Sequence, residues 1–202
     1  MMKSKLKFKK LLNEYKSLKY EEQYIKEVLR DSHQDFDEYY RKFCQENEVS
    51  IASLEKDNKD KVTKAFEESK QSEIKGIDEK IRAKDYDYKK IFKQIARKLH
   101  PDKLSDDDPR LSEFEDDFKK AANGINNGHW GDLFDVADKH EIDIEDYEMV
   151  NKSIKDSIDV MKKQIASLKN QYSYMFYECE EDKNCKDSVI KSFIKQLFGV
   201  KI

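Results

Sequence analysis

The sequence predicts an all-α protein, and three observations lead to that prediction. Charged residues make up 41% of the 202 residues. The chain has only 2 prolines and 5 glycines, the residue types that most often end helices and form turns. Apolar residues recur at steps of three and four over long stretches. We therefore expect long solvated helices, arranged as a helical hairpin (73–140) between two coiled-coil arms (1–72 and 141–202).

The first arm carries an apolar seam whose register is interrupted by Glu22 and Ser32. The seam consists of Phe8, Leu11, Tyr15, Leu18, Ile25, Leu29, Phe36, Tyr39 and Phe43. Alternating steps of three and four are typical of a coiled coil. The large rings favour an antiparallel or intramolecular pairing, because they do not fit uniform knobs-into-holes layers. The lysine-rich start, 3–10, is interpreted as a solvated helix end rather than as a contact with an anionic surface or nucleic acid.

Residues 49–84 continue the helical pattern more weakly, and charged residues dominate them. Their apolar positions are Ile51, Leu54, Val62, Phe66, Ile74, Ile77 and Ile81. We expect one or two helices here, with Gly76 as a candidate break.

Residues 88–103, YKKIFKQIARKLHPDK, hold the most informative pattern of the chain. One apolar stripe is formed by Ile91, Phe92, Ile95, Ala96 and Leu99. The other faces are basic. Pro101 has no N–H to donate and disfavours the α conformation in His100, so the helix must end there. We therefore expect His100 and Asp102 on an exposed turn at the end of a basic helix.

This stretch resembles the second helix and signature loop of a J domain, the module by which Hsp40 co-chaperones stimulate the ATPase of Hsp70. The family's buried positions in that helix are matched by Phe92, Ile95, Ala96 and Leu99. Lys103 matches the basic residue that commonly follows the signature. The IKGI at 74–77 is similar to the end of a J domain's first helix, although the tyrosine-rich start that precedes it in the family is missing.

The resemblance implies a partner-binding site for Hsp70. Asp102 would engage a cationic group near the interdomain linker of Hsp70, Pro101 would hold the loop rigid, and His100 would orient it. The acidic face of the Hsp70 nucleotide-binding domain would be met by Lys89, Lys93, Arg97, Lys98 and Lys103.

Two further helices are expected after the signature. An acidic loop leads into a helix that begins near Ser112, where a serine precedes glutamates. Its apolar face consists of Phe114, Phe118, Ala121, Ala122 and Ile125. This face can pack antiparallel against the basic helix, with the signature at the tip of the hairpin. A short helix follows, bearing Trp130, Leu133, Phe134 and Ala137.

The second arm carries a seam with regular steps of four and three. It consists of Ile154, Ile158, Met161, Ile165, Leu168, Tyr172, Met175 and Cys179. We expect it to pair antiparallel with the first seam as a stalk within one monomer, and homodimerisation through the same seams is the competing arrangement. The apolar last helix, 189–198, is expected to cap the bundle, with a partner-docking surface as the alternative.

The cysteines and histidines give no indication of a metal or cofactor. Cys44, Cys179 and Cys185 form no CxxC pair, which excludes the zinc-binding repeats of larger Hsp40 proteins. Cys179 and Cys185 flank a short charged stretch and could meet across a turn if oxidised. In a reducing cytoplasm we expect both to be free thiols, with the disulfide as the alternative. The remaining candidate ligand, His140, has no cysteine near it and is expected to be structural or solvent-facing, as is His129.

Charge and hydropathy narrow the function further. The net charge is −3, so the protein as a whole has no excess of positive charge that would attract nucleic acid. No apolar run reaches membrane-spanning length and no signal-peptide core is seen, so a cytoplasmic location is expected. An enzyme is not expected, because no nucleophile, carboxylate pair or glycine-rich phosphate loop accompanies His100. The sequence predicts a J-domain co-chaperone whose arms recruit an unidentified client. The alternative is a structural coiled-coil protein in which HPDK is accidental.

Overall fold

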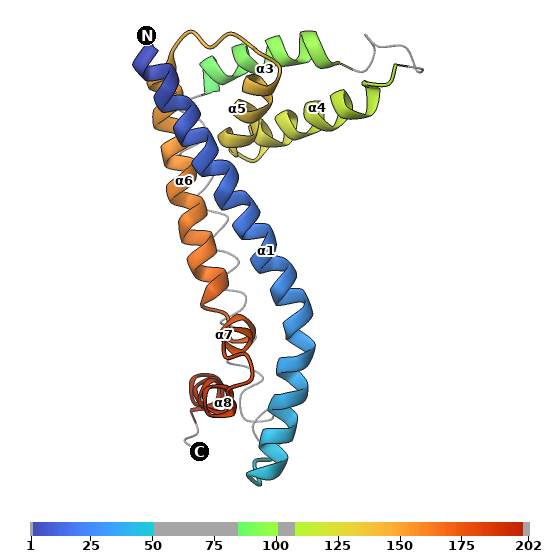
Figure 1. The fold of residues 1–202 in the computed structure, drawn as a ribbon, viewed down its shortest axis with the longest axis vertical. Helices are drawn as coiled ribbons and strands as arrows, with labels where there is room; N and C mark the ends of the chain where they lie inside the picture. Colours follow the sequence, from blue (N-terminus) through green and yellow to red (C-terminus); the bar gives the residue numbers. More distant parts are fainter. Residues whose placement is uncertain (1, 51–84, 101–107, 200–202) are drawn as a thin grey trace. The chain divides into compact units, whose positions relative to one another are not determined.

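The computed structural model describes residues 2–50, 85–100 and 108–199. Within these ranges every regular element is a helix, so the predicted all-α class is confirmed. The helices are α1 (Met2–Glu46), α3 (Asp85–Leu99), α4 (Leu111–Asn126), α5 (Trp130–Lys139), α6 (Tyr147–Lys169), α7 (Tyr172–Glu178) and α8 (Lys183–Phe198), shown in Figure 1. The helices expected in 51–84 and the boundary expected at 72/73 lie outside the described residues.

Contacts divide the chain into two units. The first contains the described residues of Met1–Leu18 and Ile74–Met161, and the second those of Lys19–Glu73 and Lys162–Ile202. Each unit is therefore assembled from segments that are far apart in the sequence, and the long helices α1 and α6 contribute to both.

The first unit is built on a hairpin of α3 and α4, which run in opposite directions and pack together (Figure 1). Helix α3 buries one apolar residue at each turn: Tyr88, Ile91, Ile95 and Leu99. The predicted stripe is confirmed for Ile91, Ile95 and Leu99, whereas its other two members, Phe92 and Ala96, are half-buried and Tyr88 was not among the predicted residues. The last helical hydrogen bond runs from the His100 N–H to the Ala96 carbonyl at 3.1 Å, directly before the proline that cannot continue the helix.

Helix α4 begins differently from the expectation. Arg110 occupies its N-cap position, and Ser112 lies exposed inside the first turn rather than capping it. The entry is instead fixed by Asp108, whose carboxylate accepts hydrogen bonds from the backbone N–H and the guanidinium of Arg110. These hydrogen bonds lower the pKa of Asp108 to about 2.

The expected short helix is present as α5, and it packs against both α3 and α4. All four of its predicted apolar residues are buried: Trp130, Leu133, Phe134 and Ala137. Close contact with α4 depends on Gly124, because a Cβ there would lie 3.0 Å from the carbonyl oxygen of His129. The ring of Trp130 lies against that of Tyr88, with centroids 4.1 Å apart, so α5 closes the apolar side of the hairpin.

The start of α1 completes the first unit together with the start of α6. The rings of Phe8 and Tyr147 lie 5.5 Å apart edge to face, and Asn151 Nδ2 donates to the Ser4 carbonyl at 3.1 Å. An antiparallel stalk would place Phe8 beside the far end of the second seam. The antiparallel prediction is therefore wrong, because the two helices lie start beside start (Figure 1). Heptad spacing marks the apolar face but does not specify the direction of the partner.

The second unit has its own apolar core, formed by α1, α7 and α8. Its buried members are Phe36, Tyr40, Phe43, Cys44, Phe176, Cys179, Val189, Ile190 and Ile194. The expectation that the last helix caps the bundle is confirmed within this unit. The predicted seam of the second arm does not lie on one continuous helix, however. Helix α6 ends at Lys169, and the extended backbone of Gln171 separates α6 from α7.

The cysteines of the second unit also differ from the expectation. Cys179 and Cys185 form a disulfide, with Cα atoms 5.5 Å apart, so the prediction of two free thiols is wrong for this structure. The turn between α7 and α8 brings the two residues together, as the alternative of a disulfide requires. The expectation of free thiols rested on the expected reducing compartment and not on the distance between the residues. Cys44 is a free thiol in the buried core.

Candidate functional site

The candidate site lies at the tip of the α3–α4 hairpin, where α3 ends. The ring of Phe118 on α4 stacks against that of Phe92 on α3, with centroids 5.8 Å apart. It also contacts the His100 ring edge to face at 5.4 Å. His100 is half-buried as a result. The aromatic contact holds the ring of the residue that immediately precedes Pro101 against α4.

The basic residues of α3 do not form one uniform surface. Lys89, Lys93 and Arg97 are exposed on faces of the helix away from its buried stripe. Lys98 instead donates from Nζ to the His140 carbonyl at 2.6 Å, which ties the end of α3 to the end of α5. Lys98 therefore has a structural contact that the sequence did not predict.

Lys90 also has a partner within the first unit, because its Nζ lies 2.6 Å from Glu145 Oε2. Both side chains are exposed, with 58% and 67% of their surface accessible, so this pair contributes only about 0–1 kcal/mol. It nevertheless shows that the basic helix already has an acidic neighbour in the segment before α6.

The remaining predicted site residues, Pro101, Asp102 and Lys103, lie outside the described residues. The structure therefore places five of the eight predicted residues on or directly after α3: Lys89, Lys93, Arg97, Lys98 and His100.

A buried ionic cluster lies behind the hairpin tip, and the sequence reading did not find it. His140 Nε2 lies 2.7 Å from Asp117 Oδ2, and Lys139 Nζ lies 2.7 Å from the same oxygen. Lys139 also contacts Glu113 Oε1 at 2.7 Å. Phe114 covers the imidazole edge to face at 5.1 Å. The cluster thus joins the first half of α4 to the end of α5.

The charge of this cluster follows from its contacts. Burial alone would raise the pKa of Asp117, but hydrogen bonds from Lys139 and His140 outweigh it and hold the pKa below its usual value. The pKa of Lys139 is raised, chiefly by its hydrogen bonds to Asp117 and Glu113. Asp117 is therefore ionised at neutral pH.

One sequence signal could have indicated Asp117. It lies three residues after Phe114 and four before Ala121, which places it on the apolar face of α4. A carboxylate at such a position requires a buried partner. His140 supplies one, so the interpretation of His140 as structural agrees with its contacts.

The described residues suggest neither metal binding nor a membrane segment. They contain no group of three or more His, Cys, Asp or Glu side chains arranged to hold a metal ion. Among them no helix combines the length and apolar character needed to cross a lipid bilayer.

Comparisons with family models, with curated proteins and with solved structures found no match to this chain.

Proposed function

We propose that this protein is a J-domain-like co-chaperone that binds an Hsp70-type chaperone and stimulates its ATP hydrolysis. One observation supports this more than any other. The basic helix α3 pairs with α4 as a hairpin, and α3 ends at Leu99, directly before the sequence His100-Pro101-Asp102. The ring of Phe118 on α4 packs against the His100 ring.

The exposed cations define which residues would meet the partner. Lys89, Lys93 and Arg97 provide positive charge along α3, and such charge raises association rates with an acidic surface. We assign Lys98 a mixed role, because its ammonium group is bonded to the His140 carbonyl. Pro101, Asp102 and Lys103 complete the proposed contact by resemblance alone.

The rest of the proposal concerns the setting of this activity. We propose that the second unit recruits or orients a client protein and that the protein acts in the cytoplasm without a cofactor or catalytic activity of its own. The alternative is a structural coiled-coil protein with no effect on Hsp70.

Steady-state ATP hydrolysis by Hsp70, with and without the full-length protein, separates the two. We expect stimulation by the wild type and its loss in Asp102→Asn. Asp116→Asn is the matched control, because Asp116 is an exposed aspartate of α4 and its substitution should leave stimulation unchanged.

Circular dichroism melting of each variant shows whether the fold is retained. His100→Gln is a second loss variant, and melting matters most there because His100 contacts Phe118. Stimulation that survives in both Asp102→Asn and His100→Gln would refute the proposal. No stimulation by the wild type of any Hsp70 tested would favour the structural alternative.

A further inference from the structure

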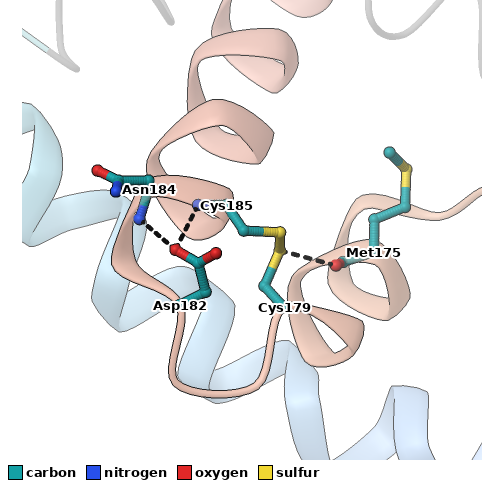
Figure 2. The surroundings of a disulfide bond; sticks show 5 residues. All are labelled: Met175, Cys179, Asp182, Asn184 and Cys185. Atoms are coloured by element: carbon teal, nitrogen blue, oxygen red, sulfur yellow. Dashed lines mark hydrogen bonds between the residues drawn. A yellow bond between two sulfur atoms is a disulfide. The ribbon is translucent and has the colours of Figure 1, made fainter.

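The disulfide of the second unit lies at the turn between two helices. Cys179 directly follows α7, and Cys185 lies in the first turn of α8 (Figure 2). The two cysteines are six positions apart, so the cross-link closes a small loop around the turn. Such a bond constrains this local segment and leaves the rest of the second unit's core to be held by apolar packing.

We propose that Cys179 and Cys185 form a reversible thiol–disulfide switch, which low-molecular-weight thiols such as glutathione reduce and the corresponding disulfides re-form, and which controls the order of the α7–α8 turn. The proposal does not depend on binding to Hsp70.

The two cysteine residues differ in exposure, and this difference favours one direction of attack. Cys179 is buried, with 5% of its surface exposed, whereas Cys185 is half-buried. An external thiolate therefore attacks the sulfur of Cys185 and the Cys179 sulfur leaves as a thiolate. Asp182, Lys183 and Asn184 are exposed residues of the turn that borders this position.

The exchange balances in two steps. The first thiolate bonds to Cys185 and breaks the internal S–S bond, giving a mixed disulfide and a Cys179 thiolate that takes up a proton. A second thiolate attacks the sulfur of the small molecule in the mixed disulfide and releases Cys185. The products are two cysteine thiols and one small-molecule disulfide, so two electrons pass to the protein. Oxidation is the reverse sequence.

Both redox states have local support in the structure. The Cys179 sulfur lies 3.4 Å from the Met175 carbonyl, which can accept a hydrogen bond from the thiol once the bond is reduced (Figure 2). Asp182 Oδ1 accepts hydrogen bonds from the backbone N–H groups of Asn184, at 2.9 Å, and of Cys185, at 3.2 Å. These N-cap bonds do not involve sulfur, so Cys185 remains positioned to pair again.

The segment that the bond constrains has little stability of its own. Helix α7 contains seven residues, which is too short to be stable without tertiary contacts. Glu180, directly after Cys179, has a φ of 47°, in the left-handed region that non-glycine residues adopt at a cost. Reduction removes the covalent link across this residue. The turn then has a route to relaxed conformations that the cross-link excludes.

Cys44 provides an internal reference for the test. It is fully buried in the core of the second unit, and burial raises the pKa of its thiol. A buried, protonated thiol reacts slowly with alkylating reagents. Modification of Cys44 therefore reports opening of the whole core, whereas modification of Cys179 and Cys185 reports the switch.

The test equilibrates the full-length protein in glutathione buffers that range from fully oxidised to fully reduced. Native alkylation followed by mass spectrometry then measures the state of each cysteine. We expect Cys179 and Cys185 to be paired in oxidised buffer, to become alkylated together in reduced buffer, and to pair again after reoxidation. Cys44 should stay unmodified throughout.

Hydrogen exchange on the same samples measures the effect on the turn. We expect the amides of residues 179–183 to exchange about tenfold faster after reduction, with those of the middle of α6 unchanged. Cys185→Ser should show the fast rate in every buffer, and the matched variant Cys44→Ser should retain the redox response. If Cys185→Ser does not fold, the comparison of oxidised and reduced wild type still decides the question.

Three results would overturn the proposal. The cysteines could stay unpaired in fully oxidised glutathione. The pair could resist reduced glutathione until the protein is denatured, which would make it a permanent structural cross-link. Reduction could also leave exchange of the turn unchanged.

Discussion

Substitution of Asp117 by alanine tests the buried cluster that joins α4 to α5. The carboxylate accepts from His140 at 2.7 Å, and the two side chains are only 11% and 9% exposed. The variant leaves the imidazole N–H buried without its acceptor, a loss that costs about 1–3 kcal/mol. Lys139 is 43% exposed and keeps its ion pair with Glu113, so the loss of its ion pair with Asp117 costs at most about 1 kcal/mol. We expect the free energy of unfolding of the first unit to fall by about 1–4 kcal/mol.

The assay is urea unfolding at pH 7, followed by tryptophan fluorescence. Trp130 is the single tryptophan of the chain and lies in the first unit against Tyr88, so its emission reports this unit specifically. The matched control is Asp116→Ala, which removes an exposed carboxylate from the neighbouring position and should change stability by less than about 0.5 kcal/mol.

A double-mutant cycle with His140→Ala isolates the coupling between the two partners. We expect the double variant to be less destabilised than the sum of the single variants, because removal of His140 also removes the unpaired N–H. The reasoning would be refuted if Asp117→Ala were no more destabilising than Asp116→Ala, or if the two single changes were additive.

Two further predictions concern the contacts of α1 in the first unit. Gly131→Ala should destabilise this unit by about 1–3 kcal/mol in urea unfolding, because a Cβ there would clash with the ring of the buried Tyr15. Helix propensity alone would give a gain of about 1 kcal/mol, so a stabilised variant would contradict the contact. Asp135 should contribute stability that is lost in acid: burial alone would raise its pKa, but hydrogen bonds from Lys120 and Lys16 hold it below the usual value. The contribution is therefore complete above the unfolded pKa of about 3.9 and is lost as the pH falls through the lower folded value. Urea midpoints measured from pH 5 to pH 2.5 should fall less steeply for Asp135→Asn than for the wild type, and parallel curves would show that the carboxylate contributes nothing.

The sequence predicted the helices better than it predicted their arrangement. Periodicity identified the buried stripe of α3 and the apolar residues of α5, because burial on one face leaves a pattern every three or four residues. The same pattern does not show whether two paired helices run parallel or antiparallel. The contact of Phe8 with Tyr147 depends on a long connection between the two arms, and apolar spacing contains no information about that connection.

The candidate site was predicted only in part, because some of its contacts also join residues that are far apart in the sequence. The end of α3 at Leu99 follows from the chemistry of Pro101 and needs no tertiary information. Lys98, in contrast, was assigned to the basic surface, and its hydrogen bond to the His140 carbonyl joins residues that lie 42 positions apart. Asp117 was not predicted, because apolar periodicity does not show that a carboxylate on that face of α4 meets His140, 23 positions away. The disulfide was the less favoured alternative, because the expected reducing compartment favours free thiols and the sequence does not give the distance between Cys179 and Cys185.

The segmented composition of the first unit has a consequence for synthesis on the ribosome. Phe8 and Leu12 emerge early, but Tyr147 and the buried Val150 and Ile154 of α6 are translated much later. At about 5–20 residues per second, the N-terminal helix waits roughly seven to thirty seconds for these partners. During that interval its apolar face is exposed on the nascent chain, a condition that favours aggregation or capture by other chaperones. A protein proposed to assist Hsp70 would thus itself present a typical chaperone substrate before its own fold is complete.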